Sequence, residues 1–128
     1  MMEKRTPDSE LAKSLLIMAT NRFDYFFPKG NSIFTMEGIY EAILELSHTL
    51  MALQGLKTVS HECAIAFLKG RYLDDYEVDF LDKLRKKRHG AKYYGRILSE
   101  ETIGNNIERG VAVFKKMKSV AEKELAKH

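Results

Sequence analysis

Residues 33–54 read IFTMEGIYEAILELSHTLMALQ, which is the strongest helical signal in the chain. Apolar residues recur along this stretch at spacings of four and three: Ile39, Ile43, Leu46, Leu50 and Leu53. This recurrence is the period of one face of an α-helix. Further apolar residues widen that face, and Gly55 follows as a C-terminal cap. We therefore expect this stretch to form the most buried helix of the protein.

Four more helical segments surround this one, and no stretch shows the alternation typical of a β-strand. They cover about residues 8–27, 60–69, 74–98 and 99–126. In the first of them the large apolar residues fall near one side: Leu11, Leu15, Met18, Phe23 and Phe26. Short connections between long amphipathic helices favour antiparallel neighbours. The sequence predicts an all-α, up-and-down antiparallel bundle of about five helices.

Length and composition indicate one domain. The 128 residues are 45% hydrophobic and 30% charged, an ordinary balance for a folded chain. We expect residues 8–126 to form a single helical domain and residues 1–7 to be flexible. No window holds the roughly 20 apolar residues that cross a bilayer, and the start lacks the apolar core of a signal peptide. With Cys63 as the single cysteine, these features predict a cytoplasmic protein without membrane attachment.

The most unusual segment is residues 83–96, KLRKKRHGAKYYGR, in which seven of fourteen residues are Lys or Arg and none is acidic. On a helix, Arg88 falls within an arc that also holds Phe80, Leu84 and Leu98. An unpaired buried charge is costly. Arg88 therefore requires an acidic partner, a phosphate or a subunit boundary.

Two interpretations of the basic segment remain open. An arginine fork suits phosphate and lysines would steer a polyanion, while tyrosines could stack on unpaired bases. The residues assigned to this RNA or nucleotide site are Lys86, Lys87, Arg88, Lys92, Tyr94 and Arg96. In the second interpretation the segment is a solvated helix, since five acids in residues 74–82 precede the bases and suit the helix dipole. Tyr93 and Tyr94 would then pack with their hydroxyls at the rim.

A metal centre is not expected. Glu45 and His48 have the Glu-x-x-His spacing of carboxylate-bridged metal bundles, but no second copy exists. Together with Glu41 they lie opposite the apolar stripe, so we expect them to face away from the core. The histidines lack zinc-ligand spacing, and no glycine-rich phosphate loop is present. We therefore predict no metal and no cofactor.

Two blocks of the sequence resemble the HEPN family of small helical domains. One is Gly38-Ile39-Tyr40-Glu41-Ala42-Ile43-Leu44-Glu45-Leu46, continuing through Leu50, Gly55 and Ser60-His61. The other is Arg88-His89-Gly90-Ala91-Lys92-Tyr93, followed by Ser99-Glu100-Glu101 and the last helix. The first is similar to the family's second helix and glycine turn, and the second to its arginine motif. The resemblance covers about residues 10–125.

This resemblance implies a helical bundle that is commonly a homodimer. In active members, a metal-independent ribonuclease site forms where the arginine-to-histidine motifs of two subunits meet. Many such domains are encoded beside a minimal nucleotidyltransferase, as toxin–antitoxin pairs. The catalytic residues carried over are Arg88 and His89, with Tyr93 at the position of the motif-ending histidine.

Tyr93 is the main departure from the family pattern. A histidine can transfer a proton near neutral pH, whereas a tyrosine titrates near 10. His89 would have to act as the acid and base, with Arg88 stabilising charge on the phosphorus. The leading hypothesis is therefore a dimeric HEPN-like protein that binds RNA or a nucleotide, with cleavage left open. The alternative is a non-catalytic interaction module that homodimerises or docks a partner such as a nucleotidyltransferase.

Overall fold

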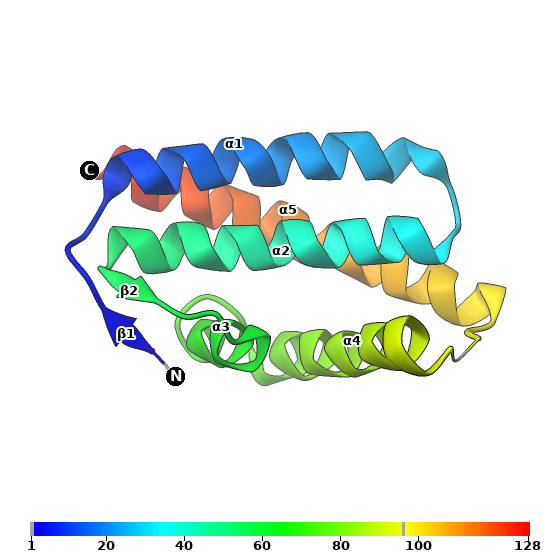
Figure 1. Ribbon diagram of the computed structural model, residues 1–128. Helices are drawn as coiled ribbons and strands as arrows, with labels where there is room; N and C mark the ends of the chain where they lie inside the picture. Colours follow the sequence, from blue (N-terminus) through cyan, green and yellow to red (C-terminus); the bar gives the residue numbers. More distant parts are fainter. Residues whose placement is uncertain (1, 96) are drawn as a thin grey trace.

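A computed structural model describes residues 2–95 and 97–128, except for the side chains of residues 91–94. Within these ranges the chain forms five helices that pack against one another (Figure 1). They are α1 (Ser9–Phe26), α2 (Ile33–Leu53), α3 (His61–Leu68), α4 (Asp75–Tyr94) and α5 (Glu100–Ala126). A short 3₁₀ turn, η1 (Phe27–Lys29), follows α1. The predicted bundle of five helices is confirmed.

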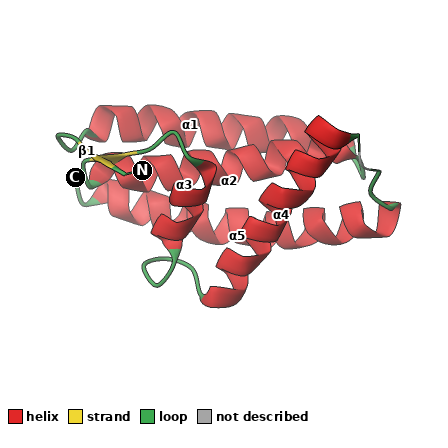
Figure 2. Ribbon diagram, turned by 60° about the horizontal axis from the view of Figure 1, so that its bottom comes forward, coloured by secondary structure: helices red, strands yellow, loops and turns green. Residues whose placement is uncertain are grey.

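Helix α2 lies at the centre of the bundle. It packs side by side with α1 and is crossed by α5 from behind, while α3 and α4 lie along its remaining side (Figure 1). Figure 2 shows that α4 runs obliquely to α1 and α2. Most residues of α2 are buried, including Tyr40, Ile43 and Leu46, which have no exposed surface. The prediction that this helix is the most buried is confirmed.

Side-chain caps fix where each helix begins. In every case an oxygen of the N-cap residue accepts the backbone N–H three positions later. These caps are Asp8, Ser32, Ser60, Asp74 and Ser99. At Asp74 the Glu77 carboxylate also accepts the N-cap N–H, which completes a capping box. The caps satisfy N–H groups that would otherwise lack partners.

The chain before α1 forms a strap against the end of α2. Strand β1 (Glu3–Lys4) pairs antiparallel with β2 (Leu56–Lys57). The Arg5 N–H donates to the Gly55 carbonyl at 2.6 Å, and the Asp8 N–H donates to the Ala52 carbonyl at 2.9 Å. We call residues 3–8 the N-terminal strap. This two-residue pairing is too short to leave an alternation in the sequence, and the flexibility expected for residues 1–7 stays a prediction.

The sequence predicts that the large apolar residues of α1 fall near one side, but this is not the side that α1 buries. Ala12, Ala19 and Phe23 face the core, whereas Leu11 and Met18 are 49% and 51% exposed. Neighbouring positions point about 100° apart on a helix, so the buried face is turned by one residue from the face with the largest side chains. The small alanines allow α1 to pack closely against α2.

Membrane-spanning potential is absent from the part of the chain that the structure describes. None of its helices is long and apolar enough to cross a bilayer. The longest, α5, is strongly amphipathic and buries only one stripe of side chains.

Candidate functional site

Residues 83–94 of the basic segment lie on the last three turns of α4. This helix ends at Tyr94, four residues earlier than the predicted end at Leu98. Gly95 follows in the left-handed conformation, with φ 63°, and its N–H donates to the Gly90 carbonyl. A positive φ is costly for other residues but open to glycine. Gly95 therefore ends the helix.

The first cations of the segment are paired with acids. The Arg85 guanidinium contacts Asp82 at 2.9 Å and Glu62 of α3 at 3.1 Å. Lys86 Nζ lies 3.3 Å from the other Asp82 oxygen. The hydrogen bond from Arg85 is the main reason that the pKa of Asp82 is lowered. The charges of Arg85 and Lys86 are thus partly neutralised within the protein. Both side chains are therefore less available to bind an external polyanion.

Arg88 is held between α4 and α2 by two glutamates. Its Nη2 lies 2.9 Å from Glu41 Oε1, and its Nε lies 4.0 Å from Glu37 Oε2. The guanidinium carbon is 5.8 Å from the centre of the Tyr40 ring. Only 16% of the Arg88 side chain is exposed. Of the partners that the sequence allowed for this arginine, the structure supplies the acidic one.

The Nε of Arg88 remains unsatisfied. It is buried and has no hydrogen-bond partner among the described residues. Glu37 Oε2, at 4.0 Å, lies beyond hydrogen-bond distance of this Nε. Glu37, Glu41 and Tyr40 were not identified as site residues from the sequence. Glu37 lies one turn before Tyr40 and Glu41 on α2, and this spacing could have placed the three on one side of the helix. Nothing local indicates that α4 covers this side.

Tyr40 links the same region to α3. Its hydroxyl lies 3.1 Å from His61 Nδ1, and its side chain is fully buried. Burial raises the pKa of the Tyr40 phenol, so the group stays protonated at neutral pH. His61 follows the Ser60 cap and opens α3. Its contact with Tyr40 adds a connection between α2 and α3.

Glu45 also forms an ion pair, and it does not face away from the core as expected. Its Oε1 lies 2.6 Å from Nε of Arg22 on α1, and only 12% of its side chain is exposed. The Glu41 side chain is 31% exposed because α4 covers it through Arg88. The expectation fails because α2 is central, so that neighbouring helices cover the side opposite its apolar stripe as well.

His48 gives a testable pH dependence. Burial, and then the neighbouring His61, lower the pKa of the His48 imidazole. Below its unfolded pKa of about 6.5, the unfolded chain therefore binds more protons at this site than the folded protein. We expect the free energy of unfolding to decrease as the pH falls below about 6.5. His48→Gln should lose part of this decrease in urea titrations at several pH values.

The control for this prediction is His128→Gln, because His128 is exposed at the end of the chain. It removes an imidazole without changing a buried position. If the His48→Gln protein keeps the full pH dependence of the original protein, His48 is not responsible for it.

The remaining predicted site residues fall into two groups. His89 is exposed and Lys87 is half-buried, next to Arg88 on α4. The others lie outside the described residues, in three cases by their side chains alone: Lys92, Tyr93, Tyr94 and Arg96. Lys86, Lys87, Arg88 and His89 occupy consecutive positions of α4, which point about 100° apart, so the helix does not place all four side chains on one face.

Metal binding finds no support in the described residues. No group of three or more His, Cys, Asp or Glu side chains there is arranged to hold a metal ion. Glu45 and His48 have the spacing of a metal motif, but the Glu45 carboxylate forms an ion pair with Arg22. The chemistry available near Arg88 is that of hydrogen bonding and charge.

Comparisons with known proteins do not assign the chain to a family. No family model matches it, and no curated protein or solved structure is significantly similar to it. The likeness to the HEPN family therefore stays a prediction that rests on the two sequence blocks quoted above. The function has to be argued from the bundle and its contacts.

Proposed function

We propose that this protein is an HEPN-like helical bundle that binds RNA or a nucleotide at the basic C-terminal end of α4. The observation that carries the proposal is the fixed position of Arg88. Glu41 holds one edge of its guanidinium at 2.9 Å, so the side chain is already oriented before a ligand arrives. An arginine has five N–H donors and can engage a phosphate while it keeps a carboxylate partner.

The charge distribution along α4 supports this position for the site. Acids occupy its first half, and no acidic residue occurs between Asp82 and Glu100. Lys87 and His89 flank Arg88 in this acid-free stretch and would attract a phosphate backbone. Binding at a boundary between two copies would enlarge the basic surface, in line with the homodimer that the resemblance implies.

Catalysis is a further step within this proposal. An active version would cleave RNA without a metal, with His89 moving the proton and Arg88 stabilising the charge that develops on the phosphate. Tyr93 in place of the motif-ending histidine favours binding over cleavage, because an unperturbed phenol holds its proton at neutral pH. A role as one component of a toxin–antitoxin pair, with a nucleotidyltransferase partner, belongs to the same proposal.

The test is binding of a labelled, mixed-sequence single-stranded RNA in EDTA, measured by fluorescence anisotropy and checked on gels for cleavage. We expect log K to fall linearly with log salt concentration. Lys87→Gln should weaken binding and reduce the salt slope by about 1, as expected for one lost phosphate contact.

Lys115→Gln is the matched control, since it removes the same charge from an exposed position on α5. If Lys115→Gln weakens binding as much as Lys87→Gln does, the contact is not specific to α4. Absence of binding even at low salt would reject the proposal. Cleavage that is lost in His89→Gln would show that the site turns over.

A second candidate function rests on the exposed side of α1. Its large residues recur at spacings of four, three and seven and form what we call the α1 stripe: Leu11, Leu15, Met18 and Tyr25. Of these, Met18 and Tyr25 are 51% and 61% exposed. Such spacing is typical of a helix that pairs with another helix. We propose that the α1 stripe serves as a homodimer interface if the protein is an interaction module.

Met18→Glu is expected to reduce dimerisation, measured by analytical ultracentrifugation over a range of concentrations. A charge at the centre of an apolar seam would lose its hydration without a partner. Ile17→Glu is the control, because Ile17 is 56% exposed on α1 but lies outside the α1 stripe. Equal effects of the two substitutions, or a monomer at all concentrations, would rule out this interface.

A further inference from the structure

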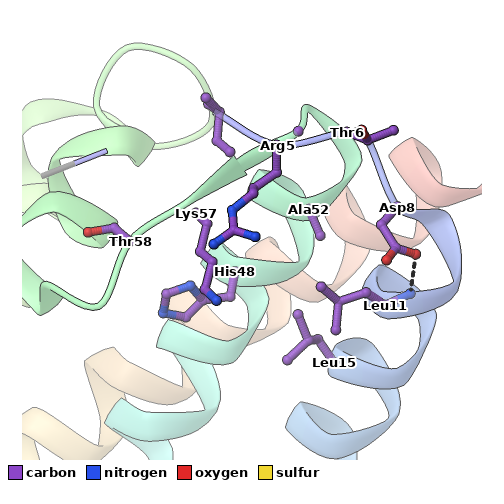
Figure 3. A pocket seen from close by; sticks show the side chains of 11 residues that line it. Arg5, Thr6, Asp8, Leu11, Leu15, His48, Ala52, Lys57 and Thr58 are labelled. Atoms are coloured by element: carbon purple, nitrogen blue, oxygen red, sulfur yellow. Dashed lines mark hydrogen bonds between the residues drawn. The ribbon is translucent and has the colours of Figure 1, made fainter. Parts of the chain in front are cut away.

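A hollow of about 590 Å³ lies between the N-terminal strap, the first turns of α1 and the end of α2 (Figure 3). It is far from Arg88 along α2 and shares no residue with the proposed RNA site. Its volume is within the range of about 300–1,000 Å³ that small-molecule sites occupy. The strap, α1, α2 and β2 all contribute to its wall.

Two cationic side chains and one histidine reach into the hollow from three different elements. Arg5 comes from the strap, Lys57 from β2 and His48 from α2, and Figure 3 shows them close together. The acid that lines the same hollow, Asp8, is used as a helix cap and accepts the Leu11 N–H at 2.9 Å. The hollow is therefore electropositive on one side.

The charge of Arg5 is paired only with an exposed acid. Its guanidinium lies 2.9 Å from Glu3, but both side chains are more than half exposed, at 53% and 61%. Exposed ion pairs of this kind contribute little free energy, so an anion in the hollow could replace Glu3 as the partner of Arg5.

The opposite side of the hollow is apolar. Leu11, Leu15 and Ala52 line it from α1 and α2, and Figure 3 shows these residues on the side away from Lys57. Leu11 keeps 49% of its surface exposed because no other part of the described chain covers it. A ligand with an apolar body would bury this surface, and burial of apolar area is favourable.

From these observations we propose that the hollow binds a small amphipathic anion, that is, a carboxylate or phosphate group attached to an apolar body. The anionic group contacts Arg5 and Lys57, with His48 as a further hydrogen-bonding partner. The apolar body packs on Leu11, Leu15 and Ala52. The RNA proposal is not required for this site, whereas the α1 dimer would compete with it, because Leu11 and Leu15 also belong to the α1 stripe.

The main chain keeps the site preformed. The Arg5 N–H donates to the Gly55 carbonyl at 2.6 Å, which fixes the strap over the end of α2. Gly55 has φ 70°, and a Cβ at this position would overlap the Arg5 carbonyl oxygen and lie 3.0 Å from Pro7 Cδ. Gly55→Ala therefore moves the strap, and with it Arg5, away from the hollow.

The experiment measures Kd for four probes by NMR titration of the ¹⁵N-labelled protein: octanoate, octyl phosphate, 1-octanol and inorganic phosphate. Octanoate and octyl phosphate are expected to bind more tightly than the other two, since only they combine charge with an apolar body. The two anions also distinguish a carboxylate from a phosphate ligand. Shifted amide signals should map to the strap, His48, Ala52 and β2.

Lys57→Gln and Arg5→Gln should each weaken binding of the better anion about tenfold, the effect expected for one charged hydrogen bond. Lys115→Gln on α5 should leave the Kd unchanged, and Gly55→Ala should weaken binding while the helical circular dichroism signal is kept. Equal binding of octanoate and 1-octanol, or of octyl phosphate and inorganic phosphate, would overturn the proposal. So would unchanged affinity in both Lys57→Gln and Arg5→Gln.

Discussion

Arg88→Met is expected to lower the free energy of unfolding by about 3 kcal/mol, a cost typical of breaking one partner of a mostly buried ion pair. The substitution leaves Glu41 facing the α2–α4 contact without its guanidinium partner. The estimate is at the low end for buried pairs, since 31% of the Glu41 side chain still contacts solvent. Urea unfolding followed by circular dichroism measures the change.

A double-mutant cycle separates the pair from the packing of the arginine. Combining Arg88→Met with Glu41→Gln should cost about 1–2 kcal/mol less than the sum of the two single substitutions. Lys83→Met is the control, because Lys83 pairs with Asp79 at the surface, with 66% and 61% of the side chains exposed. It should have little effect on stability. Simple additivity in the Arg88–Glu41 cycle would show that the two residues do not interact.

The same variants bear on RNA binding. If Arg88→Met remains folded in water and binds RNA less tightly, the arginine contributes to both stability and recognition. If RNA binding is unchanged while stability falls, the role of Arg88 is limited to the contact between α2 and α4. In that case the proposed site near this arginine is wrong, and Lys87→Gln should then have no effect on binding either.

Gly38→Ala is expected to destabilise the protein by about 1–2 kcal/mol, in spite of the higher helix propensity of alanine. Gly38 is buried within α2, and an added Cβ would overlap the Phe26 ring. Phe26 would have to move away from the junction of α1 and η1. Thermal and urea unfolding of the variant measure the loss.

Gly104→Ala provides a matched control within α5. There the nearest atom to an added Cβ is Asn31 Oδ1 at 3.4 Å, which is an ordinary contact. This substitution should therefore stabilise the protein by about 0.5–1 kcal/mol, because it lowers the entropy of the unfolded chain. If both glycine substitutions change stability in the same direction, close packing of Phe26 on Gly38 is not the reason that glycine occupies this position.

The features predicted well from the sequence are those set by local physics. The apolar period of residues 33–54 predicted α2, and the predicted segment 99–126 matches α5. Capping and periodicity depend on residues within one or two turns, which a single sequence displays. The end of α4 was missed because Gly95 stops the helix in a left-handed conformation, although an apolar residue follows at Leu98.

Features that depend on distant parts of the chain were missed or only half seen. The requirement that Arg88 find a partner was clear from its helical position, but Glu41 lies 47 residues earlier in the chain and on another helix. The buried side of α1 is set by its close approach to α2. Alanines therefore occupy the inner positions, and leucine and methionine lie at exposed ones. The strap and its hollow depend on main-chain bonds between residues about fifty positions apart.

Both ends of the chain lie at one end of the bundle, next to the strap, whereas the last turns of α4 lie at the opposite end (Figure 1). A fluorescent protein, affinity tag or surface linker joined to the C-terminus would therefore leave the Arg88 region accessible. The same addition at the N-terminus would crowd the hollow beneath Arg5 and could displace β1. Immobilised protein for RNA measurements is best attached through residue 128, and ligand titrations at the hollow require a chain without an N-terminal addition.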